Sequence, residues 1–155
     1  MKVLGIDPGT ARVGYGLVDY NENKYKMLDY GCIYTSKDME MPKRLNMIHK
    51  ELTAIIKLYD PDYIAVEKLF YFKNKKTVIS VGQASGVIVL TCEQAKKPIA
   101  RYTPLQIKMG ITGYGRAKKK QIQLMVKKIL KLKELPKPDD AADGLAIAIT
   151  HINTL

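Results

Sequence analysis

Cysteine, histidine and tryptophan are scarce in this sequence, and their scarcity narrows the chemistry that it can support. Of the 155 residues, two are cysteine, two are histidine and none is tryptophan. Cys32 and Cys92 lie far apart in apolar stretches, so we expect free buried thiols and no disulfide. We expect His49 and His151 to be surface or packing residues. Because no Ser-His-Asp or Cys-His arrangement is suggested, the sequence does not predict catalysis by a serine or cysteine nucleophile.

Long apolar runs and linkers are also missing. The first ten residues, MKVLGIDPGT, lack the apolar run of a signal peptide. The longest uncharged stretch, residues 77–92, is shorter than a membrane span and contains two glycines. No Pro-, Gly- or Ser-rich linker and no repeat divides the chain. We therefore expect a cytoplasmic protein with no membrane partner, folded as a single domain over residues 1–155.

Negative charge is in short supply as well. The chain has 26 Lys or Arg residues and 15 Asp or Glu residues, which give a formal net charge of +11. Residues 116–137 contain nine of the Lys or Arg residues and a single Glu. This excess favours association with nucleic acid or another anionic surface. A solvated lysine face explains the charge alone equally well.

The apolar pattern predicts strands first and alternating helices and strands afterwards. Short apolar runs separated by turn residues predict an antiparallel meander, and a later change to helical spacing predicts amphipathic helices. The expected strands are 3–6, 13–20, 25–35, 63–66 and 99–102. The expected helices are 42–59, a long helix ending near 95, a short helix from 104, 116–132 and 139–151. This order indicates an α/β three-layer domain with a mixed five-stranded sheet flanked by helices.

Four acidic residues stand where the apolar pattern does not explain them. Asp7 and Glu67 each follow an apolar strand, at the sheet edge where ligands collect in α/β proteins. Asp140 and Asp143 are three residues apart at the start of an Ala-rich helix and project from one face. Asp140 could cap the helix, but Asp143 lies a turn further in, where an acid is costly to bury without a cation. The four acids together predict a metal site, although each alone could cap a turn or pair with a lysine.

An all-oxygen set of carboxylates suits Mg²⁺, with Mn²⁺ as a substitute, better than zinc. Two such ions about 4 Å apart can activate water and stabilise the leaving oxygen during phosphodiester hydrolysis. The turn of residues 5–14 is comparable to the phosphate-binding turn of sugar kinases and actin-like ATPases. Those proteins need a second nucleotide-binding half, for which this chain has no room, so we do not predict ATP binding.

The loop after Glu67 combines aromatic and basic residues. Residues 68–76 contain both phenylalanines of the chain and four lysines. Aromatic side chains on a basic loop can stack on unpaired bases for roughly 1–3 kcal/mol each. We expect Phe70 to make such a contact, with Lys73, Lys75 and Lys76 on the nucleic-acid backbone. The alternative is that Leu69 and Phe72 anchor the loop in the core.

Taken in order, four motifs give the chain a family resemblance. They are Gly5-Ile6-Asp7-Pro8-Gly9, Ala65-Val66-Glu67 with Phe70, Gly82-Gln83-Ala84 and Asp140-Ala141-Ala142-Asp143. Over Met1 to about Ile152, the chain resembles the RuvC-type Holliday-junction resolvases, which are crossover junction endodeoxyribonucleases of the RNase H-like superfamily. The resemblance implies an RNase H-like fold, a catalytic metal set of Asp7, Glu67, Asp140 and Asp143, and a role for Phe70 at bases near the crossover.

The resemblance extends to a basic segment and to an assembly. Residues 106–108 and 113–121 are similar to the DNA-contacting segment of the family, with Lys108 and Lys119 at its functional lysines and Lys119 in the catalytic set. A run of three lysines leaves open which of them is functional, and Arg116, Lys118 and Lys120 would add DNA contacts. Gly144 replaces a common alanine, which should weaken its helix slightly.

As implied by the resemblance, the protein would be a homodimeric hydrolase of DNA recombination and repair. It would resolve four-way junctions by paired symmetric nicks that leave 5′-phosphate and 3′-hydroxyl ends, in partnership with the RuvA-RuvB branch-migration complex. One side of the helix that ends near 95 could form the dimer contact, or could pack only on its own sheet. It comprises Val78, Val81, Gly82, Ser85, Ile88 and Val89.

Two rival functions share parts of this pattern. A related nuclease of RNA–DNA hybrids would keep the acids but would need contacts to 2′-hydroxyl groups. A junction-binding architectural protein would bind without cutting, and it would have no use for four converging acids that repel DNA.

Overall fold

A two-residue turn joins the long strands at the start of the chain. In the computed structural model, which describes residues 1–69 and 75–155, β1 (Lys2–Asp7), β2 (Arg12–Asn21) and β3 (Lys24–Tyr34) form the predicted antiparallel meander. Glu22 and Asn23 have φ of 49° and 61°, the left-handed conformation that a tight hairpin turn requires. The meander supplies three adjacent strands of the sheet.

The remaining strands extend the sheet beyond β1 in parallel. β4 (Tyr63–Glu67) pairs with β1, and β5 (Ile99–Tyr102) pairs with β4, giving the strand order β3-β2-β1-β4-β5. Ile6 of β1 is in register with Val66 of β4. Because the two strands are parallel, the residues that follow this pair, Asp7 and Glu67, lie at the same edge of the sheet.

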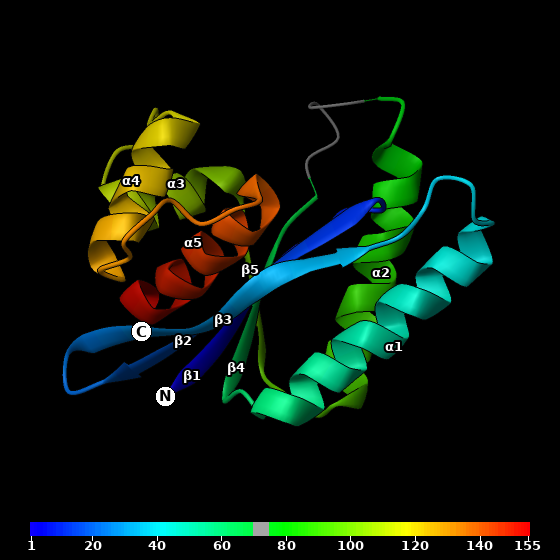
Figure 1. Cartoon of the computed structure of the whole chain (residues 1–155), viewed down its shortest axis with the longest axis horizontal. Coiled ribbons are helices and arrows are strands. Elements are labelled where there is room, and N and C mark those ends of the chain that lie inside the picture. Colours follow the sequence, from blue (N-terminus) through cyan, green and yellow to red (C-terminus); the bar gives the residue numbers. More distant parts are fainter. Residues whose placement is uncertain (70–74) are drawn as a thin grey trace.

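Helices cover both faces of the sheet, as predicted for a three-layer domain (Figure 1). One face carries α1 (Met41–Tyr59) and α2 (Val78–Gln94). The other carries α3 (Pro104–Thr112), α4 (Lys119–Ile129) and α5 (Asp139–Thr154). In the part of the chain that the structure describes, no helix is long and apolar enough to cross a membrane.

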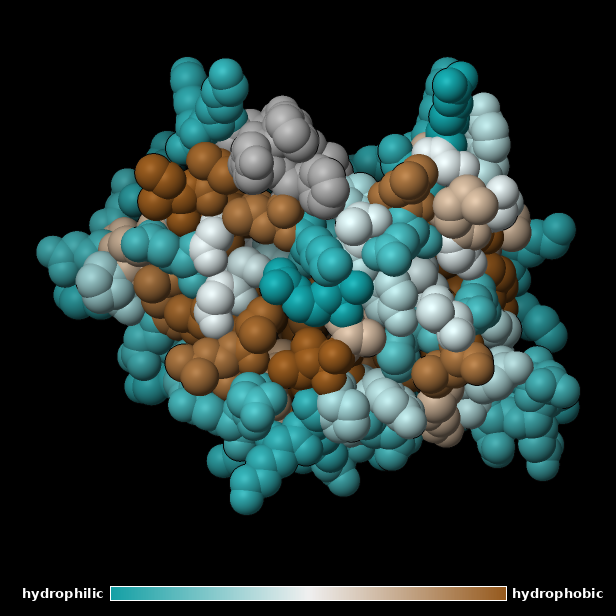
Figure 2. All heavy atoms as spheres, turned by 180° about the vertical axis from the view of Figure 1, so that it is seen from behind, coloured by the Kyte–Doolittle hydropathy of each residue, from teal (hydrophilic) through white to brown (hydrophobic). Residues whose placement is uncertain are grey.

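The outer side of α2 is apolar and exposed. Ile79 and Leu90 are 76% and 55% exposed, and Gly86 lies between them on the same helix. Figure 2 shows brown, hydrophobic spheres gathered on the half of this face where α2 lies, while teal side chains project around the outline. Of the residues expected along one side of this helix, Ser85 and Ile88 are buried and the other four are half-buried, so that side packs in part on its own molecule. The exposed stripe is rotated toward Ile79, Gly86 and Leu90.

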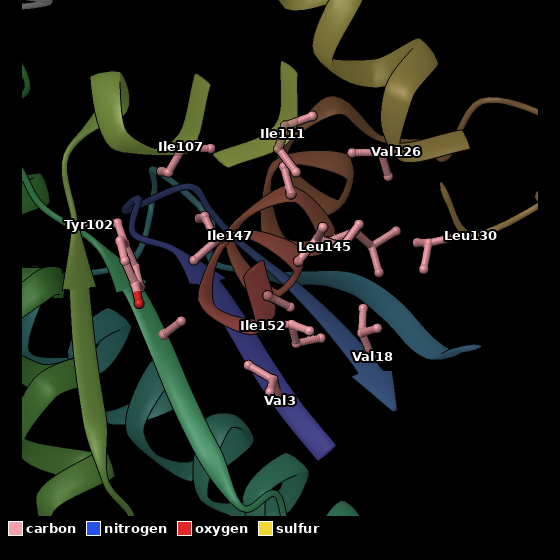
Figure 3. Packing of buried hydrophobic residues seen from close by; sticks show 14 residues of the cluster. Val3, Val18, Tyr102, Ile107, Ile111, Val126, Leu130, Leu145, Ile147 and Ile152 are labelled. Carbon is pink, nitrogen blue, oxygen red and sulfur yellow. The ribbon is translucent and has the colours of Figure 1, made fainter. Parts of the chain in front are cut away.

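Each helical layer forms its own core against the sheet. On the α5 side, Leu145, Ile147 and Ile152 of α5 pack with Val3 and Val18 of the sheet and with residues of α3 and α4 (Figure 3). On the other side, α1 buries Ile48, Leu52 and Ile56, as its predicted apolar face requires. His49 bonds Thr91, and buried His151 bonds Tyr102, so both are packing residues. Both cysteines are free, with Cys92 buried and Cys32 half-buried.

Glycines allow α5 to lie unusually close to the sheet. A Cβ atom added to Gly144 would lie 2.5 Å from the carbonyl carbon of Tyr15 and 2.6 Å from the backbone nitrogen of Gly16. Real side chains do not tolerate such separations, so the glycine is required for close approach of the two backbones. The expected slight loss of helix propensity at Gly144 is therefore accompanied by a packing role that the sequence did not indicate.

Two helices differ in length from their predicted ranges. α4 begins at Lys119 instead of Arg116, because Lys118 has an extended backbone and donates its N–H to the Gln121 side chain at 2.7 Å. It ends at Ile129 because Lys131 takes a left-handed conformation, with φ of 53°. α5 begins where predicted and continues past His151 to Thr154.

Candidate active site

The carboxylates predicted as metal ligands meet at one place. Single carboxylate oxygens of Asp7, Asp140 and Asp143 all lie within 4.8 Å of one another. The Glu67 carboxyl is close enough to Asp7 for a hydrogen bond when one of the two is protonated. The structure therefore brings together all four acids, two from the ends of parallel strands and two from the first turns of α5.

A glycine on β2, Gly14, allows the start of α5 to pack closely enough to place its acids in the cluster. A Cβ atom on Gly14 would lie 1.8 Å from the backbone oxygen of Asp140, an impossible overlap. Gly14 is also the register partner of Asp7. The start of α5 therefore rests directly on the strand beside Asp7, which places Asp140 and Asp143 beside the end of β1.

The pKa values of Asp7 and Asp143 are both raised. Burial, the negative charge of Glu67 and a hydrogen bond with it hold the pKa of Asp7 well above its usual value. Burial also raises the pKa of Asp143, although nearby Lys119 opposes this effect. A cluster of carboxylates that resists ionisation in this way is stabilised by a cation that binds all of its oxygens at once.

Lys119, the first residue of α4, contacts the acidic cluster. Its Nζ lies 3.5 Å from a carboxylate oxygen of Asp143 and 3.6 Å from one of Asp139. Burial lowers the pKa of Lys119, but the charges of these acids outweigh it and the net pKa is raised. Lys119 is thus a protonated ammonium at the edge of the cluster. Within the described chain, Lys118 and Lys120 have no such ion pair with the acids.

A cleft of about 670 Å³ opens beside the carboxylates. Asp7, Glu67 and Asp143 form part of its wall, and five basic residues line it as well: Lys68, Lys108, Arg116, Lys118 and Lys119. The cleft therefore combines carboxylates that can hold metal ions with cations that can hold phosphates. Lys120 lies outside its lining, on the exposed surface of α4.

The predicted contacts of the loop after Glu67 have separate outcomes. Phe70, Phe72 and Lys73 lie outside the described residues. Lys75 and Lys76 are exposed just before α2. Leu69 is 37% exposed and lies near Gly82 of α2, so it is not a core residue; the alternative that Phe72 anchors the loop stays untested.

One residue beside the acids was not predicted from the sequence. Arg12, the first residue of β2, places its Nε 3.3 Å from a carboxylate oxygen of Asp140. Its position shortly after the Asp7-Pro8-Gly9 turn was the available signal, because a turn that follows one strand returns the chain to the same sheet edge.

Comparisons with known proteins agree with this geometry. Residues 3–151 match the family described as crossover junction endodeoxyribonuclease RuvC. The chain is 61% identical to the RuvC of Fusobacterium nucleatum over 155 residues, which cover all of this chain and 82% of that relative. It is 55% identical to the RuvC of Syntrophomonas wolfei over 154 residues, or 99% of this chain and 90% of that relative. The structure of Thermus thermophilus RuvC in complex with Holliday junction substrate matches with a TM-score of 0.93 at 35% identity, covering 99% of this chain and 94% of that chain.

Proposed function

The chain belongs to the RuvC family of crossover junction endodeoxyribonucleases, and from this premise we propose that it resolves four-way (Holliday) DNA junctions with the site formed by its four acids. The observation that carries the proposal is the convergence of Asp7, Glu67, Asp140 and Asp143 beside a basic cleft. The reaction is phosphodiester hydrolysis in DNA recombination and repair. It yields paired symmetric nicks with 5′-phosphate and 3′-hydroxyl ends.

The four acids would hold two Mg²⁺ ions, with Mn²⁺ as a substitute. The donor set supports this, because it consists of carboxylate oxygens without a histidine or cysteine ligand in the group. Bound divalent ions supply activation of the attacking water and stabilisation of charge at the reacting phosphate. Asp140 and Asp143 come from one rigid helix, and Asp7 and Glu67 from paired strands. The protein therefore fixes the ligand oxygens before substrate binds.

The basic residues would hold the DNA strand across the acids. Lys119 is close enough to Asp143 to contact the scissile phosphate, and it is the lysine that this geometry favours among the three consecutive ones. Lys108, Arg116 and Lys118 line the same cleft and would contact neighbouring phosphates. Lys120, Lys73, Lys75 and Lys76 would contact the arms, and Phe70 would stack on a base near the crossover.

A homodimer would place two such sites on one junction. Support comes from the exposed apolar stripe of α2, since Ile79 and Leu90 are more than half exposed around Gly86. A groove of about 760 Å³ continues along this stripe and is lined by Leu69, Gly82 and Val89 among others. Two copies of this surface related by a two-fold axis would bury it. The two-fold axis would then place the two active sites at equivalent positions on the junction, so that the two nicks would be symmetric.

Two further assignments follow from family membership. The RuvA-RuvB branch-migration complex would be the partner that moves the junction to the preferred cleavage sequence. A cytoplasmic location follows from chromosomal DNA as the substrate. A complex with purified RuvA and RuvB, detected on a junction by native gel electrophoresis, tests the first assignment.

The test of the function is cleavage of a synthetic four-way junction in Mg²⁺, beside linear duplex and an RNA–DNA hybrid. We expect paired symmetric nicks in the junction alone and at least about a 10³-fold loss of rate in Asp7→Asn, because the ion would lose a ligand. Cutting of the hybrid alone would instead identify a nuclease of RNA–DNA hybrids. Junction binding without cutting in either Mg²⁺ or Mn²⁺ would identify an architectural protein and overturn the proposed site.

A further inference from the structure

The end of the β2–β3 ribbon next to the acids carries an unexplained pair of side chains. Arg12 begins β2 and Tyr34 ends β3, and the two residues are partners in the strand register. Cross-strand partners project from the same face of a sheet. The Arg12 side chain is 55% exposed and Tyr34 is 57% exposed. A cation and an aromatic ring therefore stand together, open to solvent, at the rim of the site.

Cations contact the acidic cluster from two different elements. Arg12 reaches Asp140 from β2, with 3.3 Å between Nε and the carboxylate oxygen. Lys119 reaches Asp143 from α4, with 3.5 Å between Nζ and the carboxylate oxygen. Figure 1 shows α4 and the end of β3 on opposite sides of the start of α5, which carries both acids. The carboxylates thus lie between a lysine side and an arginine side.

A DNA strand cut at these carboxylates has to continue in both directions from the scissile phosphate. The cleft beside Lys119 accounts for one direction through Lys108, Arg116 and Lys118. On the other side of the acids, Arg12 and Tyr34 are suitably exposed groups for a phosphate and a base. Guanidinium groups bind phosphate oxygens in a bidentate manner, and tyrosine rings stack on unpaired bases.

The local contacts keep both side chains available for this role. The Tyr34 side chain lies beside Cys32 on the same strand, and more than half of its surface stays exposed. In the ion pair of Arg12 with Asp140, the arginine side chain is 55% exposed and the aspartate side chain 29% exposed, and a pair that reaches solvent is weak enough to exchange partners. The guanidinium can therefore leave Asp140 for a phosphate oxygen without a divalent ion, and an ion at the carboxylates would favour the exchange further by neutralising Asp140.

We propose that Arg12 and Tyr34 bind the junction strand on the β2–β3 side of the scissile phosphate, with Arg12 on a backbone phosphate and Tyr34 on an unpaired base. The inference rests on the proposed active site, because it takes the acids as the point of cutting. Both residues are positioning groups for the substrate, and neither acts on the reacting bond.

The test is junction binding by fluorescence anisotropy in EDTA, so that no strand is cut, over a series of KCl concentrations. The slope of log affinity against log salt concentration is negative. Arg12→Ala should make it shallower by about 0.9, the value for one lost phosphate contact. Tyr34→Ala should weaken binding by about 5- to 150-fold with an unchanged slope, because a stacking contact releases no counterion. Arg12→Lys should keep most of the salt slope.

Two further variants make the outcome decisive. Lys24→Ala removes one exposed charge from the opposite end of the same β2–β3 ribbon and should behave like wild type. Lys119→Ala tests the proposed site itself. If Lys119→Ala reduces the slope while Arg12→Ala and Tyr34→Ala match Lys24→Ala, the inference is overturned and the site stands. If Lys119→Ala is also without effect, the DNA does not cross the acids and both fail.

Measurement of Mn²⁺ binding to the free protein distinguishes a purely internal role of Arg12, as a counter-ion of Asp140, from a role in DNA binding. If Arg12→Ala changes the Mn²⁺ dissociation constant but leaves junction affinity and its salt slope unchanged, Arg12 is only a counter-ion of Asp140 and the inference is wrong. Thermal unfolding of each variant reports whether the fold is intact. Because both side chains are more than half exposed, their replacement should leave the fold intact, and a loss of binding then reports a lost DNA contact.

Discussion

At the scale of single residues, the Asp7 carboxylate is placed for metal binding, and this placement lowers the stability of the metal-free protein. Its pKa is raised by burial and by Glu67, so the folded state binds a proton at Asp7 more tightly than the unfolded state does. The stability contributed by that proton is present at pH below the usual aspartate pKa and is lost as pH rises through the raised pKa. At neutral pH the carboxylate therefore destabilises the fold.

Asp7→Asn should raise the free energy of unfolding in EDTA at pH 7.5 by about 1 kcal/mol, the usual scale for relief of a strained functional group. The gain should shrink near pH 4, where wild-type Asp7 is protonated in the folded protein. Urea denaturation at both pH values measures it. Asp38→Asn, in the exposed loop after β3, is the matched control. An equal gain in both variants would mean that general charge reduction is the cause.

Metal binding should depend on pH in the opposite direction. Ions compete with protons for Asp7 and Asp143, whose pKa values are both raised. Mg²⁺ or Mn²⁺ affinity should therefore fall as pH is lowered, by up to about tenfold per pH unit for each proton displaced. Isothermal titration calorimetry in two buffers of different ionisation enthalpy counts the released protons. Release of no protons would contradict the pKa argument.

At the scale of elements, the contact of α5 with β2 decides whether the acids meet. Gly144→Ala should destabilise the protein by at least about 2 kcal/mol, because its Cβ would overlap the backbone of Tyr15 and Gly16. Gly86→Ala is the contrasting change in α2, since nothing lies within 4 Å of its Cβ position. That variant should gain about 0.5–1 kcal/mol of helix stability. Equal effects in urea denaturation would refute the packing argument.

The sequence predicted the elements well because apolar spacing and turn residues determine them locally. The end of β1 with Asp7 and the start of α5 with Asp140 and Asp143 were both identified in this way. The start of α4 was predicted three residues early, because the helix start depends on the bond between Gln121 and the Lys118 backbone. Which side of α2 faces outward was left open, because an apolar helix has little amphipathic signal to orient it.

The contacts across elements were beyond what one sequence could indicate. The ion pair of Arg12 with Asp140 joins residues 128 positions apart, and no local pattern specifies it. The role of Gly14 depends on how closely α5 approaches β2. By contrast, the convergence of the four acids was predictable, because each stood at the end of a strand or in the first turns of a helix, where the apolar pattern left it unexplained.

At the scale of the whole molecule, the proposed dimer predicts coupling between assembly and product pattern. Leu90→Glu places a charge on the exposed stripe of α2 and should weaken the dimer by about 30-fold or more, the effect of losing a central contact. Sedimentation velocity measures the dissociation. The same variant should give junctions with a single nick, because the two sites would no longer be held together.

Leu58→Glu is the control for this change. Leu58 is 74% exposed on α1, outside the stripe of α2, so its replacement should leave both the dimer and the paired nicks unchanged. A dimer that survives Leu90→Glu but not Leu58→Glu would place the interface on α1 instead.

The acids that form the cluster come from distant parts of the chain, Asp7 from its first strand and Asp143 from its last helix. During synthesis, the ribosome has to release α5 before the carboxylates can gather. A partly made chain can therefore display its basic surface without the means to cut. The order of the elements along the chain thus sets a lower limit on how much of it must be made and folded before the four carboxylates can act together.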